Sequence, residues 1–509
     1  VLDLATKDSV NITKGMPTSF VNIEDDHNNI YPPAYPSLGW TKDAAAVLLS
    51  DGWDIWKVPV KVGSGAAVNL TGNGKKDGIR YRQIYEWAAE NASAGGGRGG
   101  RGGRGGGGGG RGGGGGGGSD GIDLTKPIHV STYGEWTKKE GISRIDPGQP
   151  GAKVVFFEDA RFGITKAKDN DTYIYTKQSF TEFPNYWVFN PGFAGGYQIT
   201  DVNPQMKDLA WSSGTRLIEY KNSKTGARLQ GALYLPANYE AGKKYPLLVT
   251  IYEKRSQQKN GFVAPSDTRA PDPTQYTNRG YAVLDPDITY TVNDPGMSAV
   301  WCVIPAVKAA IATGIVDSAN VGLWGHSWGG YQTAFLVTQT NIFKAAIAGA
   351  PLTNMVSMYA SIYWNTGGSD ASIFESSQGR FKGNFIDNWD AYYRNSPVNF
   401  ANKVKTPLII LQNDKDGAVD FNQGVTYFNT LRQLGKEVVF LEYQGENHGL
   451  ARPVNQRDYA VRMGEWFDSH MKGAKPADWI VNGVPRLKMD EHLQSRKDTA
   501  QATVRVILP

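Results

Sequence analysis

Residues 321–330 have the sequence Val-Gly-Leu-Trp-Gly-His-Ser-Trp-Gly-Gly, and the apolar segment 331–337 follows directly. The first four residues predict a short buried strand, and residues 331–337 predict a helix. Ser327 lies two positions from a glycine on each side, in the G-x-S-x-G pattern that places a serine at the tip of a tight turn. Side chains at Gly325 or Gly329 would collide with the neighbouring strand and helix. We therefore predict that Ser327 is a nucleophile, although a chain with 62 glycines also allows an ordinary loop here.

The composition is that of a globular protein. The 509 residues suffice for two or three domains with buried cores, and 40% of them are apolar. No run of 18 or more apolar residues occurs, so we predict no membrane span. Cys302 is the single cysteine, and its apolar helical surroundings favour a buried, unreactive thiol. The chain begins with Val1 and shows no signal-peptide pattern, so we expect a processed or truncated product.

One tract holds much of the positive charge. Residues 95–118 are 20 glycines and four arginines, and the 54 basic residues less these four leave 50, against 49 acidic residues. The rest of the chain is therefore nearly neutral, without the basic surface of nucleic-acid-binding proteins. The tract cannot bury enough apolar surface to offset its ordering entropy, so we predict a disordered insertion. Arg-Gly-Gly repeats also occur in RNA-binding tails, but this tract lacks aromatic residues for base stacking. We expect no nucleic-acid partner.

Short strands are predicted in the first 204 residues. Apolar segments at 46–50, 54–58 and 68–71 are spaced as in a four-stranded propeller blade, and the pattern returns at 154–159 and 172–176. A plain antiparallel sheet domain is the alternative, because no sharp repeat is visible. We predict a partial, all-β, propeller-like domain over residues 1–204, interrupted by the insertion at 95–118.

A different pattern begins at about residue 205. Segments 216–220 and 229–235 predict a hairpin. Apolar strands then alternate with helical patterns, at 247–252, 281–284, 321–324, 345–348, 407–411 and 438–443. Such alternation indicates a mostly parallel sheet covered on both faces. We predict a doubly wound α/β domain over residues 205–475, followed by a C-terminal extension at 476–509.

An acid and a histidine are expected after the nucleophile, in the order Ser, Asp, His. Asp414, Asp416 and Asp420 all follow the predicted strand 407–411, and the residues alone do not choose among them. One of these carboxylates would hold a catalytic imidazole in the right tautomer, while the others cap turns or the following helix. His448 lies in the loop straight after a predicted strand, so we predict that it is the general base.

The remaining histidines near these segments have other predicted roles. His470 lies near a helix end, where a cation favours the helix dipole, and His492 lies in a polar tail. His326 is next to the nucleophile, but its side chain should point away, so we predict a structural role. Two donors are needed for an oxyanion. The backbone N–H of Trp328 is one, and the phenol of Tyr252, at the end of a predicted strand, is the other.

These segments together resemble the prolyl oligopeptidase family of serine peptidases, which includes dipeptidyl peptidases and acylaminoacyl peptidases. The resemblance is carried by Tyr-Pro-Leu-Leu-Val-Thr-Ile-Tyr (245–252), Gly-His-Ser-Trp-Gly-Gly-Tyr (325–331), Asp-Lys-Asp-Gly-Ala-Val (414–419) and Asn-His-Gly (447–449). It implies an α/β-hydrolase domain after a propeller, and a triad of Ser327, Asp416 and His448. Asp416 is chosen because the family places its acid three residues before the valine that Val419 matches.

The resemblance also implies that Tyr252 is the side-chain oxyanion donor. Tyr359 and Tyr363 resemble the aromatic wall of the family's S1 pocket. The chain departs from the family where Glu-Lys-Arg (253–255) replaces the usual Gly-Gly-Pro after the tyrosine. The acidic residues that bind a free amino terminus in dipeptidyl peptidases have no match that we identify.

The N-terminal domain is also short for the family. Roughly 180 residues at about 40–45 per blade give about four blades, where the family usually has seven or eight. A partial propeller leaves sheet edges that pair readily with other chains. We therefore expect either a missing N-terminal segment of a longer protein or a homo-oligomer.

The sequence thus predicts a serine peptidase that cleaves short peptides through an acyl-enzyme, without metal or cofactor. A carboxylesterase on the same triad, or a non-catalytic propeller-based binding protein, is the alternative. Relatives of this type are often exported in bacteria, which would give a periplasmic or secreted protein. The sequence leaves open the P1 preference and whether cleavage is internal or terminal.

Overall fold

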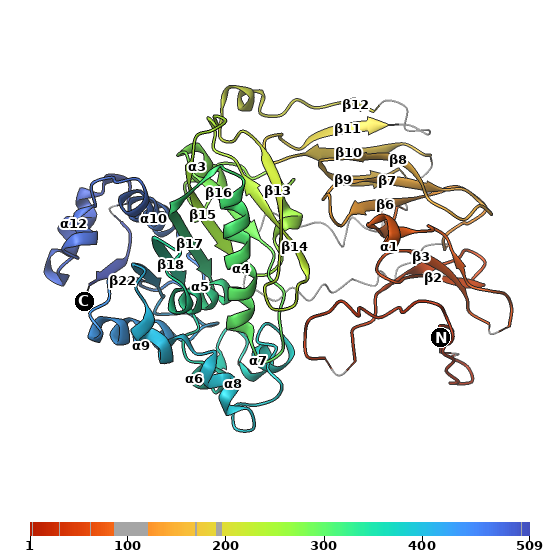
Figure 1. Cartoon of the computed structure of the whole chain (residues 1–509). Helices are drawn as coiled ribbons and strands as arrows, with labels where there is room; N and C mark the ends of the chain where they lie inside the picture. The colour runs from red at the N-terminus through yellow and green to blue at the C-terminus, as the bar shows by residue number, and fades with distance from the viewer. Residues whose placement is uncertain are drawn as a thin grey trace.

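The computed structural model describes residues 1–2, 4–29, 31–61, 63–85, 121–167, 170–189, 196–499 and 501–508. The insertion predicted at 95–118 lies outside these residues. An N-terminal region of antiparallel sheets lies beside a C-terminal α/β region (Figure 1).

The N-terminal region contains three four-stranded antiparallel sheets, each with its strands paired in sequence order. The sheets are β1 (Ser37–Trp40), β2 (Ala46–Ser50), β3 (Ile55–Pro59) and β4 (Val68–Asn69); β5 (Ile79–Ile84), β6 (Ile128–Gly134), β7 (Glu140–Ile145) and β8 (Lys153–Glu158); and β9 (Arg161–Lys166), β10 (Tyr173–Gln178), β11 (Asn185–Phe189) and β12 (Tyr197–Gln198). The described residues thus hold three such units, where the length suggests about four. Residues 31–36 include three prolines, which cannot donate to a strand ladder, and this segment forms a bend and an isolated bridge between Ala34 and Val21.

The α/β region is built on one nine-stranded sheet. Its order is β13-β14-β16-β15-β17-β18-β21-β22-β23. The strands are β13 (Thr215–Lys221), β14 (Arg228–Tyr234), β15 (Tyr245–Ile251), β16 (Ala282–Pro286), β17 (Val316–His326), β18 (Ala345–Gly349), β21 (Leu408–Leu411), β22 (Val438–Tyr443) and β23 (Val504–Ile507). The six strands from β16 to β22 pair in parallel, and β13 and β14 form the predicted hairpin. The mostly parallel sheet predicted from the apolar runs is therefore confirmed.

Helices connect these strands. They are α3 (Pro273–Asn278), α4 (Pro295–Ala312), α5 (Trp328–Gln339), α6 (Met355–Tyr359), α7 (Ala371–Ser376), α8 (Trp389–Arg394), α9 (Phe421–Gln433), α10 (Pro453–Met471), α11 (Asp478–Val481) and α12 (Met489–Ser495). Shorter elements are α1 (Gly74–Asp77), the hairpin β19 (Ile362–Tyr363) and β20 (Gly368–Ser369), and the 3-10 turns η1 (Pro204–Asp208), η2 (Ser256–Gln258), η3 (Pro397–Lys403), η4 (Arg486–Lys488) and η5 (Lys497–Thr499).

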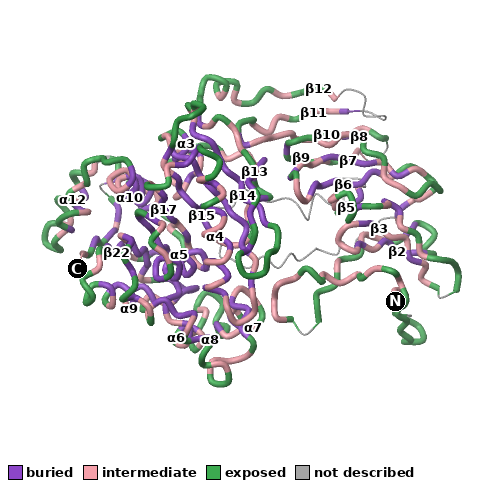
Figure 2. Tube along the Cα trace, in the orientation of Figure 1, coloured by how far each residue is buried: buried purple, intermediate pink, exposed green. Residues whose placement is uncertain are grey.

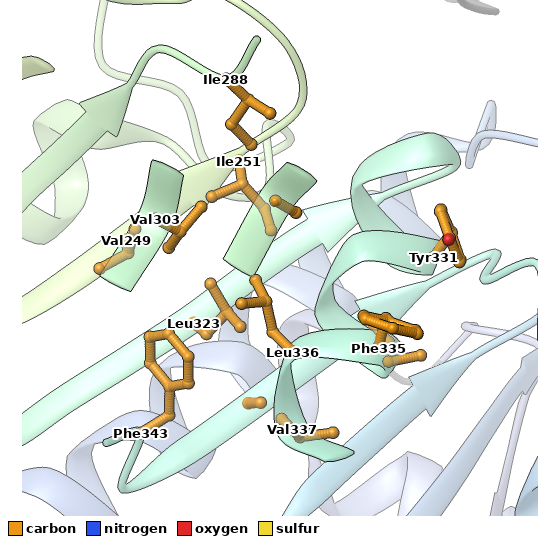
Figure 3. Close-up of a cluster of buried hydrophobic side chains, with 14 of the residues drawn as sticks. Val249, Ile251, Ile288, Val303, Leu323, Tyr331, Phe335, Leu336, Val337 and Phe343 are labelled. Atoms are coloured by element: carbon orange, nitrogen blue, oxygen red, sulfur yellow. The ribbon is translucent and has the colours of Figure 1, made fainter. Parts of the chain in front are cut away.

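Both faces of the sheet are buried, as Figure 2 shows by the purple strands. Alternate residues of β15 point to opposite faces, because strand side chains alternate. Val249 belongs to a core cluster with residues of α4, α5 and α9, seen in part in Figure 3. Leu248 belongs to a second cluster with residues of α3 and α10. Helices therefore cover both faces of the sheet, which confirms the predicted doubly wound α/β arrangement.

Helix α4 is long and apolar enough to cross a membrane, with a mean hydropathy of 1.4. The helix nevertheless packs inside the protein. One of its faces lies against the sheet through residues such as Val303 and Val307. Half of the helix is buried inside the protein, as in a core helix. Cys302 on this helix is fully buried, and burial raises the pKa of its thiol to about 11, as expected of an unreactive cysteine.

The described residues of the C-terminal extension pack on the α/β region. Strand β23 adds an antiparallel edge to β22, and Trp479 and Leu493 join the second core cluster. Beneath them, the buried carboxylate of Asp458 accepts hydrogen bonds from Arg462 Nε at 2.7 Å and Arg496 Nε at 2.9 Å. Burial opposes ionisation of Asp458, but the two guanidinium groups outweigh it and hold its pKa below its usual value.

We expect Asp458→Asn to destabilise the protein by about 3–5 kcal/mol, because Arg462 would be left as a buried cation without its counter-charge. Chemical denaturation at pH 7 measures this loss. Since the pKa of Asp458 is lowered in the fold, the difference should shrink as the pH falls below about 4. Asp490→Asn, an exposed aspartate on α12, is the control; equal stability of the two variants would contradict the prediction.

Candidate active site

Ser327 lies at the junction of β17 and α5, at the carboxyl edge of the parallel strands. Its backbone has φ 59° and ψ −121°, a conformation that residues other than glycine rarely adopt. Two hydrogen bonds hold this conformation. Ser327 N donates to Gly349 O at 2.8 Å, and Tyr331 N donates to Ser327 O at 2.9 Å.

The glycines around Ser327 are required by close backbone contacts. A Cβ at Gly325 would lie 2.1 Å from Gly329 O, at the start of α5. A Cβ at Gly329 would lie 2.4 Å from Ile251 O, at the end of β15. Real Cβ atoms do not approach backbone so closely, so the steric reason proposed for the sequence motif is confirmed.

Asp416 and His448 are brought together by the loops after β21 and β22. His448 Nδ1 lies 3.0 Å from each carboxylate oxygen of Asp416, and the Asp416 side chain is fully buried. The carboxylate also accepts from the amides of Ala418 and Val419, both at 2.9 Å. A carboxylate with so many donors is fixed in place, and it presents an acceptor to the imidazole N–H.

The two competing acids have other partners. Asp420 accepts from Asn422 N at 2.8 Å and caps the first turn of α9. Asp414 accepts from Gly445 N at 2.6 Å, in the turn after β22. The sequence predicts that two of the three aspartates cap turns or the following helix, and Asp414 and Asp420 have these roles.

His326 links the serine turn to the His448 loop. Its Nε2 lies 2.8 Å from His448 O, and the two rings pack with centroids 5.0 Å apart. Burial, together with the neighbouring His448, lowers the pKa of His326 to about 4. A neutral His326 can therefore donate from Nε2 and fix the backbone that carries His448. His470, by contrast, bonds to Trp466 O at 2.8 Å, far along α10.

Tyr252 follows β15 and lies beside Ser327. Burial raises the pKa of its phenol, while hydrogen bonding with Gln378 and Ser327 opposes that rise. The backbone N–H of Trp328 is the first amide of α5, so the helix itself supplies no acceptor for it. These two donors flank the serine, as the predicted oxyanion pair requires.

The loop after Tyr252, where the sequence departs from the resembled family, is held by acidic side chains. Asp287 Oδ1 accepts from Arg255 N at 2.7 Å and from Ser256 N at 2.8 Å. Asp285 pairs with the Arg255 guanidinium at 3.1 Å. The loop therefore has a defined shape without Gly-Gly-Pro.

The two tyrosines predicted for a substrate pocket have different surroundings. Tyr359 donates to Glu375 Oε1 at 2.5 Å and packs edge-on against Tyr392. Tyr363, on β19, is close enough to Tyr252 to act on its pKa.

The sequence did not single out Gln378, whose Nε2 donates to Tyr252 OH at 2.6 Å. No motif surrounds it, and 126 positions separate the two residues. Among the described residues, the cluster with metal-ligating chemistry is Asp25, Asp26 and His27. Asp26 is occupied there by the Arg380 guanidinium at 2.9 Å, so the arrangement resembles an ion-pair network.

The model of the prolyl oligopeptidase family matches residues 300–474, which include Ser327, Asp416 and His448. This part of the α/β region is therefore similar to the prolyl oligopeptidase family. The chain is 26% identical over 289 residues to the uncharacterized peptidase YuxL of Bacillus subtilis, covering 54% of this chain and 42% of that protein. It is 32% identical over 171 residues to the acylamino-acid-releasing enzyme of Arabidopsis thaliana, covering 33% of this chain and 22% of that one.

The likeness extends over more of the fold than of the sequence. The structure matches dipeptidyl peptidase 4 of Porphyromonas gingivalis with a TM-score of 0.60 and 16% identity, covering 86% of this chain and 58% of that chain. The likeness in fold therefore extends into the N-terminal sheets. The chain spans less than half the length of the two curated relatives above.

A buried carboxyl near this site is expected to make stability depend on pH. Asp370 is fully buried, and neither of its oxygens has a hydrogen-bond partner within the described part of the chain. Burial, with the charges of Asp420 and Asp416, raises its pKa from 3.8 to about 7. Because the unfolded chain titrates near 3.8, ionisation of Asp370 costs folding free energy progressively as the pH rises from about 4 to 7.

We expect Asp370→Asn to raise the melting temperature at pH 8 and to have a smaller effect at pH 5. The gain at pH 8 is at most about 4 kcal/mol, because one pKa unit corresponds to about 1.4 kcal/mol. Thermal melts at the two pH values test this, with Asp208→Asn, an exposed aspartate, as the control. A loss of stability at pH 8 would mean that the ionised carboxylate is paired in the fold.

Proposed function

We propose that this protein is a serine peptidase with Ser327 as nucleophile, His448 as general base and Asp416 as its orienting acid. The observation that carries the proposal is the contact of His448 Nδ1 with both Asp416 oxygens at 3.0 Å. This pair lies on the same sheet edge as the strained Ser327 turn. The match of residues 300–474 to a family of serine peptidases supports the same reaction.

The reaction follows from the roles of these groups. Asp416 holds the proton of His448 on Nδ1, which leaves Nε2 free to accept the proton of the Ser327 hydroxyl. Ser327 Oγ then attacks the substrate carbonyl, and the oxyanion accepts hydrogen bonds from Trp328 N–H and Tyr252 O–H. His448 returns its proton to the leaving amine, and water hydrolyses the acyl-enzyme by the same steps.

Short peptides are the proposed substrates. The relatives and the structural neighbour include an acylamino-acid-releasing enzyme and a dipeptidyl peptidase, whose names point to small products. The N-terminal segment also lies against the site, since Asp26 pairs with Arg380 near Tyr252. A cover of this kind would exclude large folded substrates. Tyr359 and Tyr363 are the proposed wall of the P1 pocket.

We further propose that the three N-terminal sheets are blades of a β-propeller, spanning residues 1–204 before a catalytic domain at 205–475. Their consecutive four-stranded meanders support this. Strands β1 and β12 are partly exposed sheet edges, which tend to pair with further strands.

We expect the purified 509-residue chain to associate through these edges, because unpaired strands are a template for other chains. Native mass spectrometry, with size-exclusion chromatography, measures the assembly. A compact, stable monomer would contradict this prediction and would leave the edges covered by other means.

We expect a fluorophosphonate probe to label the wild-type protein, and Ser327→Ala and His448→Ala to abolish labelling. Asp416→Asn should slow labelling by up to about 10⁴-fold, since a triad loses about this much when its acid cannot fix the imidazole tautomer. Asp414→Asn is the matched control in the same loop, and its labelling should stay near that of the wild type. The reverse order of the two aspartate variants would overturn the assignment of the acid.

Substrate comparison separates the peptidase from the alternatives. Faster turnover of aminoacyl anilides than of short-chain esters supports a peptidase, and the opposite preference supports a carboxylesterase on the same triad. A folded protein that is never labelled would favour a binding protein without catalysis.

A further inference from the structure

The Tyr252 phenol accepts a hydrogen bond in this structure. Gln378 Nε2 donates to Tyr252 OH at 2.6 Å, so one lone pair of the phenol oxygen is occupied by an amide N–H. An amide N–H cannot accept a hydrogen bond, so the phenol's own proton must point elsewhere. Hydrogen bonding with Ser327 also acts on the pKa of this phenol. The contact therefore selects the direction in which Tyr252 donates.

Arg380 fixes the short loop that carries Gln378. Arg380 has φ 51°, an uncommon conformation for a residue with a side chain, and its guanidinium is buried. Its Nη1 donates to Gln378 O at 3.0 Å and to Glu253 Oε1 at 2.9 Å. One buried cation thus holds both the backbone of Gln378 and the residue that follows Tyr252.

The Arg380 side chain also packs on Tyr290. The guanidinium carbon lies 3.8 Å from the centre of the Tyr290 ring, and Tyr290 OH donates to Tyr252 O at 3.1 Å. Gln332 Nε2 donates to the same carbonyl at 2.7 Å. Tyr290 and Gln332 therefore hold the backbone carbonyl of Tyr252, and Arg380 holds its phenol through Gln378.

The counter-charge of Arg380 comes from the N-terminal region. Asp26 Oδ1 accepts from Arg380 Nη2 at 2.9 Å and from Nε at 3.2 Å, and Asp26 Oδ2 accepts from Tyr290 N at 3.0 Å. Two residues away, Glu24 pairs with Arg80 of β5 at 2.6 Å. The segment around Asp26 is therefore bonded to an N-terminal sheet on one side and to the Arg380 loop on the other.

We propose that Gln378 is a positioning residue that aims the Tyr252 hydroxyl at the oxyanion, and that Asp26 holds Gln378 in place through Arg380. This inference rests on the proposed function, because it takes Tyr252 as the oxyanion donor. The N-terminal region then contributes to catalysis by ordering a donor, and not by touching substrate.

The kinetic test uses two replacements of Gln378 with opposite chemistry. Gln378→Leu removes the amide donor, and we expect kcat to fall about 10-fold. Gln378→Glu supplies an acceptor that captures the phenol proton, and we expect a fall of about 10²-fold, near that of Tyr252→Phe. KM for a short peptide anilide should change less than about 3-fold in each case. Gln433→Leu, an exposed glutamine on α9, is the control.

A double-mutant cycle separates positioning from a general structural effect. If Gln378 acts through the Tyr252 hydroxyl, Gln378→Leu should cause no further loss in the Tyr252→Phe background. Asp26→Asn should lower kcat about 3- to 10-fold in the wild-type background, while Asp25→Asn, the adjacent aspartate outside this ion pair, should not. Losses that multiply in the Tyr252→Phe background would overturn the inference.

A second readout does not depend on activity. In protein labelled with ¹³Cζ-tyrosine, the Tyr252 resonance, assigned by its absence in Tyr252→Phe, reports hydrogen bonding to the phenol oxygen. It should move in Gln378→Leu and in Asp26→Asn, and stay in place in the two controls. An unmoved resonance would overturn the positioning role even in an active enzyme. A wild type without any hydrolase activity would instead overturn the proposed function.

Discussion

The close approach of three backbone segments around Ser327 is the constraint on which the site depends. The end of β15, the start of α5 and the end of β18 meet where Gly325, Gly329 and Gly330 have no Cβ. A Cβ at Gly330 would lie 2.1 Å from Gly349 O, just as one at Gly329 would lie 2.4 Å from Ile251 O. Because these strands are buried on both faces, the contact cannot relax by moving apart. The strained turn of Ser327 is held by the sheet itself.

The same packing of the sheet brings the other proposed catalytic residues to Ser327. Parallel strands end at one edge of the sheet, so loops after β15, β17, β21 and β22 meet there without any special connection. Tyr252, Ser327, Asp416 and His448 each lie in one of these loops. The His326 contact with His448 O then ties the turn to the histidine loop at 2.8 Å. The sheet places these loops at one edge, and hydrogen bonds between them then order the site.

The features of this arrangement that depend on local sequence pattern could be predicted from the sequence. Apolar runs predicted the sheet, and the spacing of Gly325 and Gly329 predicted the turn, since both have steric causes within a few residues. The choice of Asp416 over Asp414 and Asp420 needed the resemblance, because all three acids share one loop. Their roles differ only in which donors each carboxylate faces. Capping of α9 by Asp420 and of a turn by Asp414 appears only once the chain is folded.

The contacts that the sequence could not predict are those between distant segments with no motif. Asp26 and Arg380 are 354 positions apart, and nothing near either residue marks the pair. The burial of Arg380 has a consequence for the whole molecule. If the N-terminal segment moved away, Arg380 would keep Glu253 but lose Asp26, and a buried cation that loses a partner is costly. The Asp26–Arg380 pair therefore couples the N-terminal segment to the α/β region beside Tyr252, at the point where the proposed reaction needs a fixed donor.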